Sequence, residues 1–149
     1  MKKYLIFIFI LFLFSCKNAK DNKTEKISDS ASTSAKVDKS KVLIYNFHVT
    51  NRCPSCIAIE EATTKTLNKY FSNEINKGRI KRQIINVDDE AYKFISEKYQ
   101  AFGSGLFVTR VYKGKEITTD LTGDGFKFAK NKEDKFIEIL KIKINEYLK

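Results

Sequence analysis

Two cysteines separated by two residues are the strongest chemical signal in this chain. The motif reads Cys53-Pro54-Ser55-Cys56. Thiols at this spacing can close a disulfide, and a disulfide that opens and closes exchanges electrons with the thiols of a partner. The chain has three cysteines, and the third, Cys16, lies far away in the N-terminal segment. The pair at 53 and 56 is therefore expected to react as a unit.

The residues around the pair predict a strand followed by a helix. Residues 41–49 form a nearly continuous apolar and β-branched run, which is typical of a strand covered on both faces. From Pro54, apolar residues recur every three to four positions as far as Lys77 and Gly78, which predicts an amphipathic helix ended by glycine. Cys53 then falls at or near the N-cap, where unpaired N–H groups and the helix dipole favour a thiolate.

This placement assigns different roles to the two thiols. Cys53 is the expected nucleophile, and the positive charge of Arg52 beside it should lower its pKa further. Cys56 lies one turn into the helix on the face expected to be buried, which suits a thiol that resolves a mixed disulfide. Pro54 fits the first helical turn because its missing N–H has no partner there.

Other readings of the pair stay open. A static disulfide across so short a loop would constrain the unfolded chain little. A zinc site needs four ligands, whereas the domain offers two cysteines and His48. His48, the only histidine, either tunes Cys53 or is a satisfied histidine at a strand edge. A reduced pair could also bind a soft ion such as arsenite or Cu(I).

The rest of residues 41–149 supplies a frame for this motif. A second strand is expected at 79–87, a short helix at 90–100 capped by Asp88 and Asp89, a hairpin at 106–112 and 116–121, and a last helix capped by Asn131. Residues expected to be buried in the two later helices are Ala91, Phe94, Ile95, Tyr99, Phe136, Ile137, Leu140, Ile144 and Tyr147 or Leu148. The order strand, helix, strand, helix, strand, strand, helix makes the opening strands parallel and the hairpin antiparallel. It predicts an α/β, thioredoxin-like domain around a central mixed sheet.

The N-terminus predicts export and lipid anchoring. Lys2 and Lys3 precede an apolar run over residues 4–14, which is well short of the ~20 residues that span a bilayer. The run ends in Leu13-Phe14-Ser15-Cys16, which resembles a bacterial lipobox. We therefore expect residues 1–15 to be a signal peptide, Cys16 to be acylated, and residues 16–40 to form a disordered tether rich in lysine and serine.

Composition and net charge limit the classes of partner that we expect. The chain carries 28 basic and 18 acidic side chains, a formal net charge of +10. An exported protein with no basic-aromatic binding motif is not expected to bind nucleic acid, and a lysine-rich surface suits anionic headgroups. No Gly-x-Gly-x-x-Gly motif is present, so no nucleotide cofactor is expected. The expected partners are a protein disulfide or dithiol and, through acylated Cys16, the periplasm-facing side of the inner or outer membrane.

Several blocks of sequence resemble the thioredoxin-like ArsF family. They are Ile44-Tyr45-Asn46-Phe47-His48, Arg52-Cys53-Pro54-Ser55-Cys56 with Ile59-Glu60, Gly78-Arg79-Ile80, Asn86-Val87-Asp88, and Tyr99. Members of this family occur with arsenic-resistance genes and are described as nitrophenyl compound nitroreductase subunits. The resemblance implies a thiol-bearing subunit that passes electrons in the detoxification of arsenicals or nitro compounds, with the disulfide Cys53–Cys56 as its redox group.

Two positions depart from the wider thioredoxin pattern. Thioredoxins carry a buried acid on the first strand, and the nearest counterpart here is Asn46, which cannot take a proton. They also place a proline before the third strand, but Pro54 is the only proline of this chain and Ser104-Gly105 stands there instead. A narrower range of partners is therefore expected.

Overall fold

A computed structural model describes residues 39–149 of the chain. The expected signal peptide at 1–15, the acylated Cys16 and nearly all of the tether lie outside the described residues. Ser40, assigned to the tether from the sequence, is only 1% exposed and belongs to the folded domain. Within residues 39–149, no helix is both long enough and apolar enough to cross a membrane.

A four-stranded mixed sheet forms the centre of an α/β domain. Its strands are β1 (Lys41–His48), β2 (Ile80–Asn86), β3 (Gly105–Tyr112) and β4 (Lys115–Asp120), in the spatial order β2-β1-β3-β4. β1 is parallel to β2 and antiparallel to β3, and β3 pairs with β4 as a hairpin. The central position of the first strand, the parallel pair and the hairpin are confirmed.

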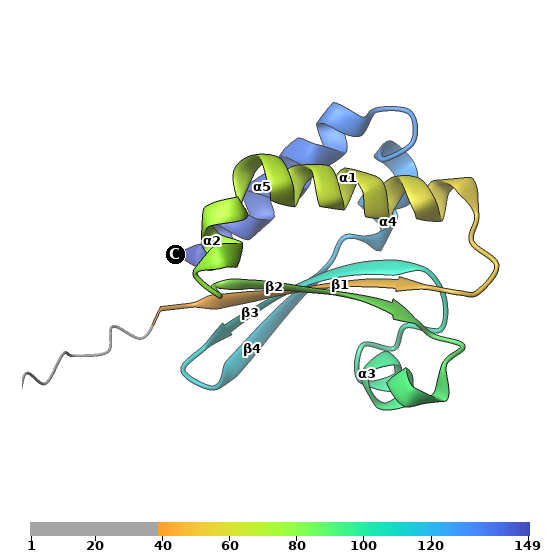
Figure 1. Ribbon diagram of the computed structural model, residues 1–149, viewed down its shortest axis with the longest axis horizontal. Coiled ribbons are helices and arrows are strands. Elements are labelled where there is room, and N and C mark those ends of the chain that lie inside the picture. Colours follow the sequence, from red (N-terminus) through yellow and green to blue (C-terminus); the bar gives the residue numbers. More distant parts are fainter. Residues whose placement is uncertain (1–38) are drawn as a thin grey trace, which may run out of the picture. The chain divides into compact units, whose positions relative to one another are not determined.

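Helices cover the two faces of this sheet unequally (Figure 1). One face carries four helices, and the other carries a short one with a 3-10 turn before it. The first group is α1 (Pro54–Tyr70), α2 (Ser72–Asn76), α4 (Thr122–Phe128) and α5 (Glu133–Leu148); the second is η1 (Glu90–Tyr92) and α3 (Lys93–Lys98).

Side chains of β1 alternate between two apolar cores, as its nearly continuous apolar run predicts. Val42 and Ile44 are fully buried on the face that α1 and α5 cover. Phe47 faces α3, where it clusters with Ile85, Tyr99 and Ala101. Tyr99 also fixes α3 to the sheet because its hydroxyl lies 2.8 Å from Oγ1 of the buried Thr109.

The helix expected from Pro54 to about Lys77 is broken at Phe71. Phe71 leaves the helical conformation at φ −130° and ψ 13°, its N–H still bonds to the carbonyl of Leu67, and its ring is 3% exposed. The neighbouring Tyr70, which the helical periodicity would equally allow in the core, is 43% exposed. The break turns Phe71 into the core, and Gly78, with φ 68°, ends α2 in the expected left-handed conformation.

The helix expected at 90–100 is shorter in the structure, and the face that it buries differs from the predicted one. Asp89 caps only the 3-10 turn, through Ala91 N–H at 2.9 Å, and the change of pitch from η1 to α3 shifts the buried face. Phe94 is consequently 80% exposed and Ala91 is exposed, so both burial predictions are wrong. The predicted burial of Tyr99 is confirmed, and Ser96 is buried as well.

The segment after the hairpin contains a helix that the sequence did not predict. A loop was expected because of its two glycines, but residues 122–128 form α4. Gly125 lies against α1, where a Cβ would come within 2.9 Å of Ile59 Cδ1, so a larger residue here would force the Ile59 side chain to shift. The predicted Asn131 cap is also wrong, because Lys132 is the N-cap residue of α5 and makes no side-chain cap bond.

Candidate functional site

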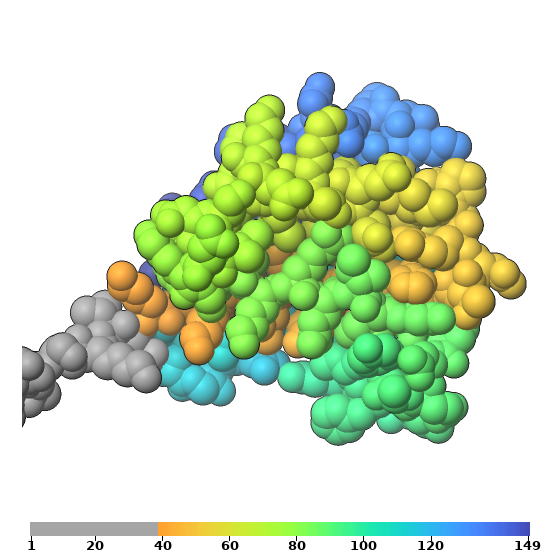
Figure 2. All heavy atoms as spheres, in the orientation of Figure 1, coloured from red at the N-terminus to blue at the C-terminus, as the bar shows by residue number. Residues whose placement is uncertain are grey.

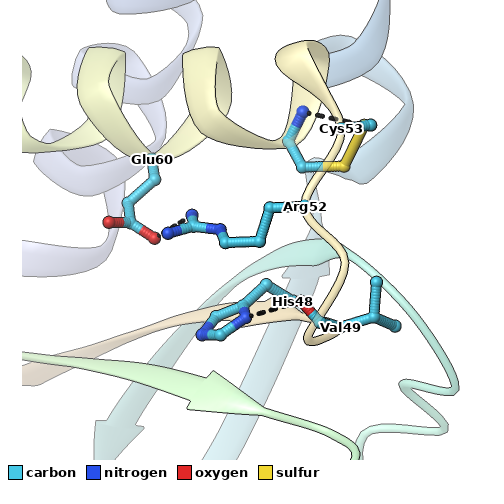
Figure 3. Close-up of a disulfide and its surroundings, with 6 residues drawn as sticks. His48, Val49, Arg52, Cys53 and Glu60 are labelled. Carbon is cyan, nitrogen blue, oxygen red and sulfur yellow. Dashed lines mark hydrogen bonds and ion pairs between the residues drawn. A yellow bond between two sulfur atoms is a disulfide. The ribbon is translucent and has the colours of Figure 1, made fainter.

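The two cysteines lie where β1 passes into α1, at the end of the sheet where β1 finishes. Cys53 is the N-cap of α1, and it forms a disulfide with Cys56 across a Cα–Cα distance of 5.2 Å. The Cys56 N–H donates to Cys53 Sγ at 3.2 Å, and Pro54 occupies the first turn. These placements agree with the sequence predictions (Figure 3).

The two sulfurs have different surroundings. Cys53 is exposed, whereas Cys56 is half-buried. A thiolate on Cys53 would accept the Cys56 N–H as a charge-assisted bond, which is stronger than a bond to a neutral sulfur. A partner therefore reaches Cys53 first, and the helix end favours its anionic form.

Contacts from the end of β2 hold the loop that leads into the motif. Thr50 N–H donates to Asp88 Oδ2 at 2.7 Å, and Asn86 Nδ2 donates to Thr50 Oγ1 at 3.1 Å. The backbone bond from Thr50 lowers the pKa of Asp88, and the charge of His48 adds a smaller effect in the same direction. Asp88 was expected to cap a helix, but it anchors this loop instead. In Figure 2, the segments that follow β1 and β2 lie at the same end of the domain.

His48 ends β1 on the helix-covered face, below the loop that carries Arg52 (Figure 3). Its Nδ1 lies 3.0 Å from the carbonyl oxygen of the adjacent Val49. The ring points back beneath the loop and not toward Cys53. In this disulfide form the structure gives His48 a local partner and shows no bond from it to the cysteines.

Arg52 is directed away from the nucleophile. Its guanidinium forms an ion pair with Glu60 of α1, and the two side chains are 28% and 22% exposed. Figure 3 shows the Arg52 side chain running beneath α1 to reach this carboxylate. The effect of Arg52 on the pKa of Cys53 stays a prediction, and the Glu60 carboxylate beside the guanidinium would oppose it.

A second arginine joins the same polar group from β2. Arg82 Nε donates to Asn46 Oδ1 at 2.8 Å, Nη1 donates to Thr64 Oγ1 at 2.6 Å, and Nη2 donates to the Glu60 carbonyl at 3.1 Å. Burial lowers the pKa of Arg82, and the negative charge of Glu60 opposes that effect. Asn46, which is 3% exposed, is thus an acceptor for an arginine.

Sequence reasoning did not assign a role to Glu60 or Arg82. Both positions carried a signal. Glu60 lies four residues after Cys56 and so shares its helix face. Arg82 lies at every second position with Ile80 and Ile84 along β2, so the three share one face of the strand. This spacing places a charged residue on the face that points toward the helices.

The third strand, β3, starts at the same end of the sheet as the cysteine pair. Gly105, the first residue of β3, pairs with Phe47, near the end of β1. Just before it, the side chain of Phe102 is 83% exposed. A shallow pocket of about 160 Å³ lies beside this loop and is lined in part by Phe102, Ser104 and Thr122. Among residues 39–149, no group of three or more His, Cys, Asp or Glu side chains is arranged to hold a metal ion.

Comparisons with known proteins identify no family. No family model matches this chain. No curated protein matches it either. One similar solved structure is described as a malarial protein; it has 13% sequence identity and a TM-score of 0.40, over 66% of this chain and 96% of its own.

Proposed function

We propose that this protein is a thioredoxin-like thiol–disulfide oxidoreductase, anchored through acylated Cys16 to a membrane of the cell envelope and facing the periplasm. One observation carries the redox proposal: the disulfide Cys53–Cys56 caps α1, with Cys53 exposed and Cys56 half-buried. An exposed sulfur at a helix N-terminus beside a shielded one is the arrangement that thiol exchange requires.

The architecture supports the thioredoxin-like assignment. The order of the elements, a parallel β1–β2 pair followed by an antiparallel hairpin, and helices on both sheet faces are features that thioredoxin-like proteins share. The motif also lies between the first strand and first helix, as in those proteins.

The reaction follows from the two environments. In the reduced protein, the Cys53 thiolate attacks a partner disulfide, forms a mixed disulfide, and releases one partner sulfur as a thiolate that takes a proton. Cys56 then gives up its proton, and its sulfur attacks Cys53 Sγ. The Cys53–Cys56 disulfide forms as the second partner thiol leaves. Two electrons and two protons pass to the partner; the reverse sequence oxidises a partner dithiol.

The resemblance to the ArsF family suggests the setting. We propose that the pair passes electrons between proteins in arsenical or nitro-compound detoxification. With no nucleotide-binding motif in the sequence, a protein dithiol would supply the electrons. The alternative, a dithiol module that binds arsenite or Cu(I), uses the same two sulfurs in reduced form.

A trapping experiment tests the exchange chemistry. In Cys56→Ser the mixed disulfide cannot be resolved, so extracts should yield Cys53-linked partner adducts that dithiothreitol releases. Cys53→Ser is the matched control and should trap no partner. An absence of adducts, together with arsenite binding by the reduced wild-type protein, would replace the oxidoreductase by the binding module.

A further inference from the structure

The charged group beneath the first two turns of α1 contains more positive than negative charge. It consists of the guanidiniums of Arg52 and Arg82 and the carboxylate of Glu60, which is bonded to Arg52. Formally, two positive charges and one negative charge leave +1. The three side chains come from the loop, β2 and α1, so the group joins three segments on the helix-covered face of the sheet.

Two members of this group neighbour the cysteines along the chain. Arg52 is adjacent to Cys53 in the chain, and Glu60 follows Cys56 by one helical turn, a spacing that places Cβ atoms about 5–6 Å apart. The Arg52 and Glu60 side chains are mostly shielded from water. Charges that are partly buried are screened less by solvent and salt than surface charges.

The sign of the effect is fixed by the chemistry of the pair. The thiolate exists only in the reduced protein, so a positive charge nearby stabilises the reduced state and makes the disulfide a stronger oxidant. A negative charge does the opposite. The Glu60 carboxylate is bonded to Arg52 and also offsets the charge of Arg82, so it opposes both cations.

We propose that Glu60 is a positioning residue that holds the Arg52 guanidinium away from Cys53 and so limits the oxidising strength of the Cys53–Cys56 pair. This inference rests on the proposed redox function. It gives the half-buried ion pair a role in setting the direction of electron flow. Ion pairs contribute little to stability compared with apolar packing, so a stability role alone explains it poorly.

The test measures the equilibrium of the pair with glutathione in the full-length chain, with Cys16→Ser so that only Cys53 and Cys56 titrate. Glu60→Gln should shift the equilibrium toward the reduced dithiol by about tenfold, or ~30 mV. The pKa of Cys53, measured by the pH dependence of its alkylation, should fall in the same variant. Arg52→Gln should shift both quantities in the opposite direction.

The double variant distinguishes a shift caused by charge from one caused by structural damage. Arg52→Gln with Glu60→Gln restores the formal charge to +1, so its equilibrium should return to within about threefold of the wild-type value. Glu133→Gln removes the carboxylate of the exposed Lys65–Glu133 pair, which also involves α1, and should leave the equilibrium unchanged.

Two results would overturn the inference. One is a Glu60→Gln equilibrium within threefold of wild type, and the other is a double variant that keeps the full Glu60→Gln shift. If Glu60→Gln does not fold, Arg52→Gln decides: a shift toward the disulfide supports the inference and its absence refutes it. Failure of the proposed function itself looks different, because Cys56→Ser would then trap no partner, whatever the glutathione equilibrium of the wild-type pair.

Discussion

The helix-covered face of the sheet has two ends of opposite character. At one end, Val42 and Ile44 of β1 pack with Phe136, Leu140 and Ile144 of α5, and all five side chains are fully buried. Further along the same face of β1, Asn46 replaces the aliphatic side chains. It bonds to Arg82, which in turn reaches the backbone of Glu60.

This difference indicates that the two ends have different roles, one in stability and the other in the chemistry of the cysteine pair. Apolar burial contributes about 25 cal/mol per Å² of surface, whereas a buried charge recovers its desolvation cost only when its partners are well placed. A chain selected for stability alone would continue the aliphatic pattern beneath the cysteines. The polar end instead groups three charges beneath the start of α1, the helix that carries the redox pair. We infer that the apolar end holds the frame and the polar end adjusts the thiols.

The largest expected effect is at the apolar end. Leu140→Ala leaves a cavity around a side chain that is 0% exposed, so the free energy of unfolding should fall by about 2–5 kcal/mol. Urea denaturation measures this loss. The glutathione equilibrium of the folded variant should match wild type, and a shift in that equilibrium would show that the two ends are not separate.

Ile142→Ala is the matched control on the same helix. Ile142 is 57% exposed, so its truncation should change the free energy of unfolding by no more than about 0.5 kcal/mol. A loss as large as that of Leu140→Ala would place Ile142 in an interface that the isolated domain does not show.

An intermediate effect is expected at the polar end. Asn46→Leu removes the acceptor for Arg82 Nε and leaves a half-buried charged donor without this partner, at a cost of about 1–3 kcal/mol. Thr64→Val removes another Arg82 acceptor, but at an exposed position, and should cost less. An Asn46→Leu protein as stable as wild type would mean that the polar end needs no such bond.

The apolar frame was largely predictable from sequence, and the polar end was not. The alternation along β1, the hairpin and the burial of Phe136 and Leu140 follow from hydrophobic periodicity, which is a local property. The N-cap position of Cys53 follows equally from local pattern. By contrast, the Arg52–Glu60 pair joins residues eight positions apart, and the Arg82–Asn46 bond joins two strands. Sequence alone does not say which partner a long side chain selects.

The unpredicted helix α4 shows the same limit in the backbone. Gly123 and Gly125 lower helix propensity, so a local reading favours a loop. The structure forms a helix because Gly125 lets α4 contact Ile59 without a Cβ between them. Tertiary packing overrides helix propensity in α4, and no pattern within the segment predicts this packing.

The smallest expected effect concerns the contact that fixes the loop before Cys53. The pKa of Asp88 lies below its ordinary value of 3.8, chiefly because its carboxylate accepts the Thr50 N–H. The carboxylate therefore adds stability above about pH 4, and this contribution disappears as the pH falls through the lowered pKa. Asp88→Asn should lower the melting temperature slightly at about pH 6 and not at about pH 2. Because a hydrogen bond dominates, the difference should persist in 1 M salt, where longer-range charge effects are screened. A difference that is independent of pH, or that salt removes, would show that this bond does not hold the loop.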